Sequence, residues 1–145
     1  HHSDLRGTSM NNANFTNADL NNSDLTRADL SEAKLIGSNL SGANLTRTDL
    51  TNTDFESAFL IGTKLDHANL SGTSFYKSFL INSNFRGASF SGIPPKFGNN
   101  IIANNISRTY DLEVVDVLKT MSDELRDLFL HANPKYKKIW ETRKS

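Results

Sequence analysis

The side chains of this sequence that could do chemistry are carboxylates and histidines, and the carboxylates recur at multiples of five residues. The recurring aspartates are Asp19, Asp24, Asp29, Asp49 and Asp54. Two carboxylates held side by side can share a proton or bind a cation, and Asp29 with Asp49 is the best candidate pair. His67 and His131 stand alone, without a phosphate-binding loop, metal-ligand spacing or nucleophile–base pair. A solvated ladder of aspartates is the simpler interpretation, so the sequence predicts no enzyme, metal site or cofactor.

The composition narrows the class of protein further. The 145 residues carry 16 basic and 16 acidic side chains, so no net charge draws the chain to nucleic acid or to an anionic membrane. There is no cysteine, which excludes disulfides and thiolate chemistry. Hydrophobic residues make up only 37% of the chain, whereas Asn, Ser, Thr and Gly are abundant. Such a mixture is typical of disorder unless a repeat arranges the few apolar residues efficiently.

A five-residue repeat provides that arrangement. From Leu5 to Phe90, every residue whose number is a multiple of five is Leu, Phe or Met. The residue two places earlier is always Ala, Ser or Thr, and the residue two places later is Gly or Asn in most copies. The large and the small residue lie on the same side of a short extended segment, so both face an interior. Gly and Asn tolerate a positive φ and therefore mark corners built as type II turns.

The pattern resembles A(D/N)LXX, the signature of the pentapeptide-repeat family, over residues 3–92. The resemblance implies an all-β solenoid, a right-handed quadrilateral β-helix with four pentapeptides in each coil. At roughly 4.8 Å per coil, the repeats make about 4.5 coils and a rod of about 22 Å. Because one fold hosts many functions, the resemblance identifies the fold rather than an activity.

Four sides per coil place residues twenty apart above one another. On the fourth side, the outward residues are polar in the first two coils, as at Asp19 and Asn39, and then become apolar. The expected apolar patch consists of Phe59, Ile61, Tyr76, Phe79 and Ile81. An exposed patch of this kind marks a contact surface. Three interpretations are open: cover by the chain's own C-terminal helices, which we favour, a partner site, and self-association.

The sequence divides into a repeat domain (1–92), an irregular connector (93–110) and C-terminal helices (111–145). The connector begins at Ile93-Pro94-Pro95. Since proline cannot donate to a strand ladder, the solenoid is expected to end there.

The apolar residues of the stretch 111–131 fall at helical spacing, with a break near 120–122 where Ser122 is a candidate N-cap. Asn133 and Pro134 are expected to be the N-cap and the first residue of a last short helix. These helices are expected to lie across the patch wall or to cap the end of the rod over Phe85 and Phe90.

The last helix mixes basic and aromatic residues. Its candidate contact residues for a membrane or a partner are Lys135, Tyr136, Lys137, Lys138 and Trp140. Basic residues interleaved with aromatic ones can bind an anionic membrane surface. The same composition suits an ordinary amphipathic helix with a solvated basic side, and this second interpretation is preferred because the segment is short.

Two functions from different classes fit the pattern. One is a non-enzymatic protein-interaction scaffold, because the chain resembles the repeat domains of secreted bacterial effectors of the PipB type, which act on host membranes or host proteins. The other is a DNA mimic, similar to family members that bind type II topoisomerases. Mimicry requires a continuous negative surface, whereas residues 1–92 carry nine acidic and seven basic residues. The preferred prediction is a scaffold with a protein partner and no nucleic acid.

The repeat is already in register at Ser3-Asp4-Leu5, and no N-terminal cap precedes it. Solenoids need such caps for solubility. We therefore expect a fragment of a longer bacterial protein whose upstream part holds a secretion signal. Without such a signal the protein is expected in the cytoplasm.

Overall fold

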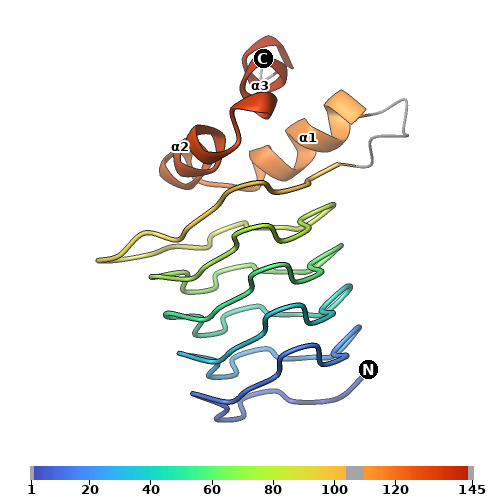
Figure 1. Cartoon of the computed structure of the whole chain (residues 1–145), viewed down its shortest axis with the longest axis vertical. Coiled ribbons are helices and arrows are strands. Elements are labelled where there is room, and N and C mark those ends of the chain that lie inside the picture. Colours follow the sequence, from blue (N-terminus) through green and yellow to red (C-terminus); the bar gives the residue numbers. More distant parts are fainter. Residues whose placement is uncertain (1, 104–109, 144–145) are drawn as a thin grey trace.

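The computed structural model describes residues 2–103 and 110–143, which form a right-handed quadrilateral β-helix closed at its C-terminal end by short helices. Figure 1 shows the stacked coils as a rod, with the helices lying across one end and the N-terminus at the other. The helical elements are α1 (Tyr110–Lys119), α2 (Asp123–Ala132), the 3₁₀ turn η1 (Pro134–Tyr136) and α3 (Lys137–Arg143). The predicted fold class is confirmed.

Backbone hydrogen bonds between coils define the register. The parallel bridges up to that between Asn69 and Ser89 join residues twenty apart, as between Asp24 and Asn44. The Leu25 N–H donates to the Asn44 carbonyl in the next coil at 2.8 Å, while the Asp24 N–H donates to the Ser3 carbonyl in the preceding coil at 2.8 Å. Because every side of a coil repeats these two bonds, the chain cannot slip by one residue without turning its apolar residues outward.

The corners have the predicted left-handed conformation. The third residue of each turn has a positive φ, and the turn closes by a bond such as that from the Ala28 N–H to the Leu25 carbonyl at 2.9 Å. The conformation is kept where the residue is neither Gly nor Asn, as at Arg27 (φ 62°) and His67 (φ 59°). The ladder therefore imposes the corner even on residues that disfavour it.

The interior contains the two predicted columns. Large residues such as Leu30 and Leu50 are fully buried, and Ala, Ser and Thr fill the space between them. Buried hydroxyls bond to carbonyl groups, as Thr48 Oγ1 does to the Leu45 carbonyl at 2.7 Å. Satisfied in this way, the hydroxyls do not leave polar atoms unpaired inside the rod.

The β-helix continues beyond the two prolines, which corrects the predicted connector. Lys96 pairs with Ser74 and Ile101 pairs with Phe79, so the register changes from twenty to twenty-two residues. Pro95 takes the place of a small interior residue, whose N–H closes a turn within its own coil and does not join the ladder between coils. Proline is therefore tolerated at this position, and residues 2–103 form five complete coils. The rest of the expected connector, residues 104–109, lies outside the described residues.

Aromatic side chains connect the interior of the rod to the helices. Phe97 stacks on Phe75 at 5.3 Å between ring centroids and meets Phe129 of α2 edge-on at 5.2 Å. Phe129 stacks in turn on Tyr136 at 6.0 Å. The helices therefore extend the hydrophobic core of the rod instead of forming a separate domain.

The end of the last coil is closed by hydrogen bonds from the helical segment. The Asn100 N–H donates to Asn133 Oδ1 at 2.9 Å, and the Asn133 amide donates back to Asn100 Oδ1 at 3.1 Å. Ser122 caps α2 as predicted, because its Oγ accepts the Leu125 N–H at 3.2 Å. Asn133 and Pro134 are the N-cap and first residue of η1, as predicted, but the Asn133 side chain makes no cap bond there because it pairs with Asn100.

Two glycine corners with the same backbone provide a test of coil stacking. Gly62 and Gly72 both have φ +66°, but a Cβ at Gly72 would meet Asn52 Oδ1, whereas one at Gly62 would meet nothing within 4 Å. We expect Gly62→Ala to lower the free energy of unfolding by about 1–2 kcal/mol through strain alone. Gly72→Ala should cost on the order of 1 kcal/mol more because Asn52 must move. Equal losses in urea unfolding would contradict this account of the corners.

The outward aspartates make the stability of the fold depend on pH. The Thr26 hydroxyl and N–H hold the pKa of Asp24 below its usual value, and those of Ser31 do the same for the pKa of Asp29. Since their folded pKa values are depressed, their stabilisation is present above about pH 4 and is lost as the pH falls through those lower values.

We expect the double variant Asp24→Asn plus Asp29→Asn to lose less stability between pH 5 and pH 2 than the native chain does, measured by thermal unfolding. Native Asn44 already accepts the Thr46 N–H at 3.0 Å from the same kind of position, so Asn fits the site. Asp54→Asn is the matched control, because the Asp54 carboxylate accepts the Glu56 N–H at 3.0 Å but Glu56 has no hydroxyl to donate a second bond. If the double variant loses as much stability between pH 5 and pH 2 as the native chain does, Asp24 and Asp29 are not the source of the acid dependence.

Candidate interaction surfaces

The predicted apolar patch centres on one wall of the rod, with Ile61 and Ile81 at the corner that follows this wall and Tyr76 at the corner that precedes it. Phe59 and Phe79 form a bridge between coils, and their rings stack at 5.0 Å with an interplanar angle of 7°. The exposed fractions are 41% for Phe59, 37% for Ile61 and 39% for Tyr76, while Phe79 and Ile81 are half-buried. Five neighbouring apolar side chains therefore face solvent over the upper coils.

The wall that carries the patch has polar outward residues in the coils nearer the N-terminus, and these residues make hydrogen bonds that phenylalanine cannot make. Asn39 is one coil below Phe59, and its Oδ1 accepts the Ser41 N–H at 3.0 Å. A phenylalanine cannot make that bond, so the patch gives up a local hydrogen bond and exposes an aromatic ring. The stacked pair contributes about 0.5–1.5 kcal/mol in return. The β-helix does not need apolar residues here, since its own polar residues suit the same positions.

The flanks of the patch carry lysines. Lys77 lies over the ring of Tyr76, with its Nζ 5.3 Å from the centroid. Lys64 stands three residues after Ile61, at the start of the next wall, and is exposed. Neither lysine has an ion pair among the residues that the structure describes. The patch is therefore apolar in its centre, with Lys64 and Lys77 at two of its edges and the exposed Glu56 one coil below Tyr76.

The C-terminal helices lie over the end of the rod and leave the patch wall uncovered. The Phe85 N–H donates to Thr120 Oγ1 at 3.0 Å, which places the α1–α2 turn on the top of the first wall. Figure 1 shows α1 and α2 across the end of the rod, beyond the last coil. The favoured prediction that the helices cover Phe59 and Phe79 is therefore not what the described residues show. The end-capping alternative is what they adopt.

The basic C-terminal segment is divided between the cap and the surface. Tyr136 is only 1% exposed, and its hydroxyl donates to the Asn100 carbonyl at 3.2 Å. It is therefore a core residue of the cap, which corrects its prediction as a membrane or partner contact. Trp140 is half-buried under the guanidinium of Arg126, 4.2 Å from its ring centroid. Lys135, Lys137 and Lys138 are exposed, as predicted.

Arg126, which the sequence analysis did not single out, joins the helices to one another. Its guanidinium donates to the Leu118 carbonyl at 3.0 Å and to the Met121 carbonyl at 2.9 Å, and it pairs with Asp123 at 2.8 Å. These bonds satisfy carbonyl groups at the C-terminal end of α1. No sequence signal could have identified this role, since it depends on how α2 folds back on α1.

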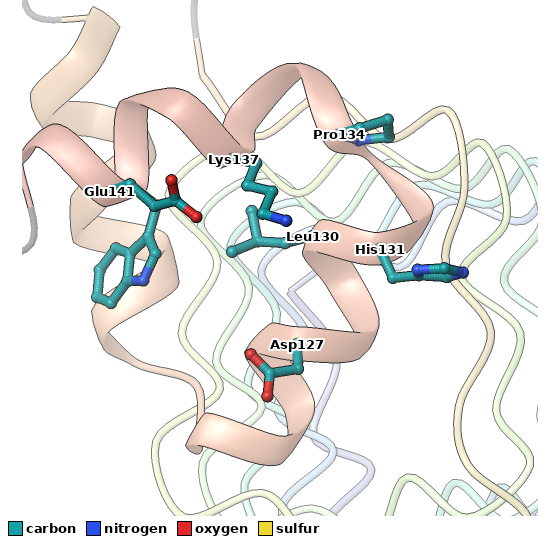
Figure 2. Close-up of a pocket in the computed structure, with 7 residues that line it drawn as sticks. Asp127, Leu130, His131, Pro134, Lys137 and Glu141 are labelled. Atoms are coloured by element: carbon teal, nitrogen blue, oxygen red, sulfur yellow. The ribbon is translucent and has the colours of Figure 1, made fainter.

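A pocket of about 420 Å³ lies between α2 and α3. Figure 2 shows Lys137 reaching into it from α3, with Asp127 and Leu130 on α2 and Glu141 beyond. Its charged residues have both signs, so the pocket has no marked preference for a cation or an anion. Asp127 and His131 also border a second cavity, on the adjoining face of α2.

The candidate catalytic pair does not form an active site. Asp29 and Asp49 are bridged neighbours, but each carboxylate accepts hydrogen bonds within its own coil, from Ser31 and Thr51. The lowered pKa of Asp29 is the opposite of what a carboxyl sharing a proton would have. Over the described ranges 2–103 and 110–143, no group of three or more His, Asp or Glu residues could hold a metal ion.

No helix in the described residues has the length and apolar character required to cross a bilayer.

The repeat and the coil geometry agree with sequence comparison. The family described as pentapeptide repeats (8 copies) matches residues 1–31, 28–66 and 58–92. The chain therefore belongs to the pentapeptide-repeat family. A comparison with curated protein sequences finds no match.

Solved structures show the same fold. The chain is similar to the pentapeptide repeat protein Rfr23 of the cyanobacterium Cyanothece 51142, with 29% identity and a TM-score of 0.60 over 65% of this chain and 63% of that one. It is also similar to a trypsin-treated variant of QnrB1, a plasmid-mediated fluoroquinolone resistance protein, with 25% identity and a TM-score of 0.50 over 68% of this chain and 52% of that one. The match spans less than two thirds of either protein.

The patch can be erased with residues that the β-helix itself uses. The substitutions Phe59→Asn, Ile61→Ser, Phe79→Asn and Ile81→Ser copy Asn39 and Ser41 into the next two coils. Because these positions face solvent, we expect the free energy of unfolding to change by no more than about 2 kcal/mol. Phe75→Ala in the core should cost about 3–5 kcal/mol. A loss of that size from the four outward substitutions would mean that the patch is part of the core.

Proposed function

We propose that this protein is a rigid, non-enzymatic scaffold that binds a protein partner on the apolar patch. The observation that carries the proposal is the exposure of Phe59, Ile61 and Tyr76 on a wall whose fold accepts polar residues equally well. Contiguous exposed apolar side chains on a soluble protein are typical of contact surfaces. Aromatic residues are the side chains that most often dominate the energy of such contacts.

The rod suits this role because the patch is preorganised. Phe59 and Phe79 are attached to backbone held by hydrogen bonds to the coils on either side, as from the Leu60 N–H to the Phe79 carbonyl at 2.8 Å. A partner therefore does not have to order a loop when it binds, which lowers the entropic cost of association.

The charges at the edges indicate the chemistry of the partner. Lys64 and Lys77 would attract an apolar surface with acidic residues beside it. Face-to-face association of two copies would bring these lysines together in a desolvated contact, which like charges disfavour. We therefore propose a different protein as the occupant, and not a second copy of this chain.

A narrower proposal concerns the setting of this scaffold. We propose that the chain is the repeat domain of a secreted bacterial effector that acts on host membranes or host proteins. The Asn- and Ser-rich repeats and the appended helices support this class. Fusion of the full-length protein to a translocation reporter tests it, and a reporter that stays in the bacterium during contact with host cells would refute it.

The alternative is the DNA mimic that binds a type II topoisomerase, and the similarity to a fluoroquinolone resistance protein favours it. The charges oppose it, because exposed basic residues such as Arg27, Arg47 and Lys64 interrupt the acidic positions on the walls. Inhibition of gyrase supercoiling by the purified protein would favour the mimic over the scaffold.

Site-specific cross-linking tests the scaffold directly. We expect benzoylphenylalanine in place of Phe59 to give a discrete adduct with one protein on illumination in the native cell. Ile36 is the control position, because it is an outward apolar residue two coils below Tyr76 and outside the patch. The adduct should disappear when Ile61→Ser, Phe79→Asn and Ile81→Ser are added. Identical adducts from positions 59 and 36, or none from position 59, would contradict the proposal.

A further inference from the structure

A second surface lies at the junction of the last coil and α2, away from the apolar patch. It is a groove of about 590 Å³. The residues that line it are Phe90, Gly92, Pro94, Glu124, Asp127, Leu128 and His131. Phe90 and Leu128 are half-buried, while Glu124, Asp127 and His131 are exposed. The groove therefore combines an apolar floor with a rim of ionisable groups.

One face of α2 forms the rim. Glu124, Asp127, Leu128 and His131 follow the spacing i, i+3, i+4 and i+7, which places them on one side of a helix. The opposite side of α2 is buried in the cap, through Leu125 and Phe129. Among the described residues, nothing covers the outer face, so it is available to a ligand.

Neither carboxylate of the rim forms an ion pair with a Lys, Arg or His side chain of the described residues. Asp123 is paired with Arg126, but Glu124 and Asp127 form no ion pair there. Glu124 lies in the first turn of α2, where a negative charge stabilises the helix. Asp127 lies beyond that turn, and the helix dipole does not account for it. Two neighbouring carboxylates beside an apolar floor fit a cation attached to an apolar group.

The length of the rim indicates the kind of molecule that would fit. From Glu124 to His131 the helix rises about 10 Å. Three residues of an extended peptide span about the same distance. The volume falls within the range of about 300–1,000 Å³ that is usual for ligand sites.

We propose that this groove binds a short segment of a partner protein in which an aliphatic or aromatic residue is flanked by Lys or Arg. The apolar residue lies on Phe90 and Leu128, and the basic residue pairs with Glu124 and Asp127. This site is independent of the apolar patch, whose lysines select the opposite charge.

The probes for the test are two synthetic peptides, Ac-Lys-Leu-Lys-Phe-Lys-amide and its counterpart with Gly at both apolar positions. Binding to the full chain is measured by isothermal titration calorimetry and by amide shifts in NMR spectra. We expect saturable binding of the first peptide with the largest shifts at residues 90–94 and 124–131. The Gly peptide should bind at least several-fold more weakly.

The double variant Glu124→Gln plus Asp127→Asn should weaken binding of the first peptide roughly tenfold. Asp116→Asn is the matched control, because Asp116 is an exposed carboxylate on α1 that does not line the groove, and its affinity should stay native. The four-substitution patch variant should also bind with native affinity. Absence of binding, equal affinity of the two peptides, or equal losses in the double variant and the Asp116→Asn control would each overturn the proposal.

Discussion

The ladder of N–H···O=C bonds that pairs residues twenty apart in neighbouring coils is the constraint on which the rest of this structure depends. It places Leu25 over Leu45 and Leu65, so a small number of apolar residues makes a continuous core. It also forces a positive φ at each corner, including corners that carry Arg or His. Because each coil supplies donors and acceptors to the next, the ladder is stable in its middle and incomplete at its ends.

The C-terminal helical segment terminates this ladder, because its side chains accept hydrogen bonds from the last coil. Three backbone N–H groups of the last coil, at Phe85, Asn100 and Ile102, donate to side-chain oxygens of Thr120, Asn133 and Tyr136. Part of the exposed edge of the β-helix is thereby satisfied without another coil. Since the helices are held at the end of the rod, they leave its walls free, and the apolar patch stays in contact with solvent.

Function in this fold is carried by outward residues, because the interior is determined by packing. The interior tolerates only large apolar or small residues at set positions, whereas the walls accept almost any side chain that does not disturb the ladder. Departures from the polar pattern, such as Phe59 and Phe79, are therefore informative. The same reasoning applies to Asp127, which lies outside the first turn of α2 and has no ion pair among the described residues.

The sequence by itself determined the register, the corners, the core columns and the wall on which Phe59 and Phe79 meet, because all of these follow from a local period of five. It also indicated the Ser122 cap, which depends on neighbours along the chain. It failed where the partner lies outside the regular twenty-residue spacing. Only the tertiary structure paired Asn100 with Asn133, buried Tyr136 and returned Lys96 to the ladder after the prolines. Such contacts depend on where the helices meet the last coil, and no local period encodes that position.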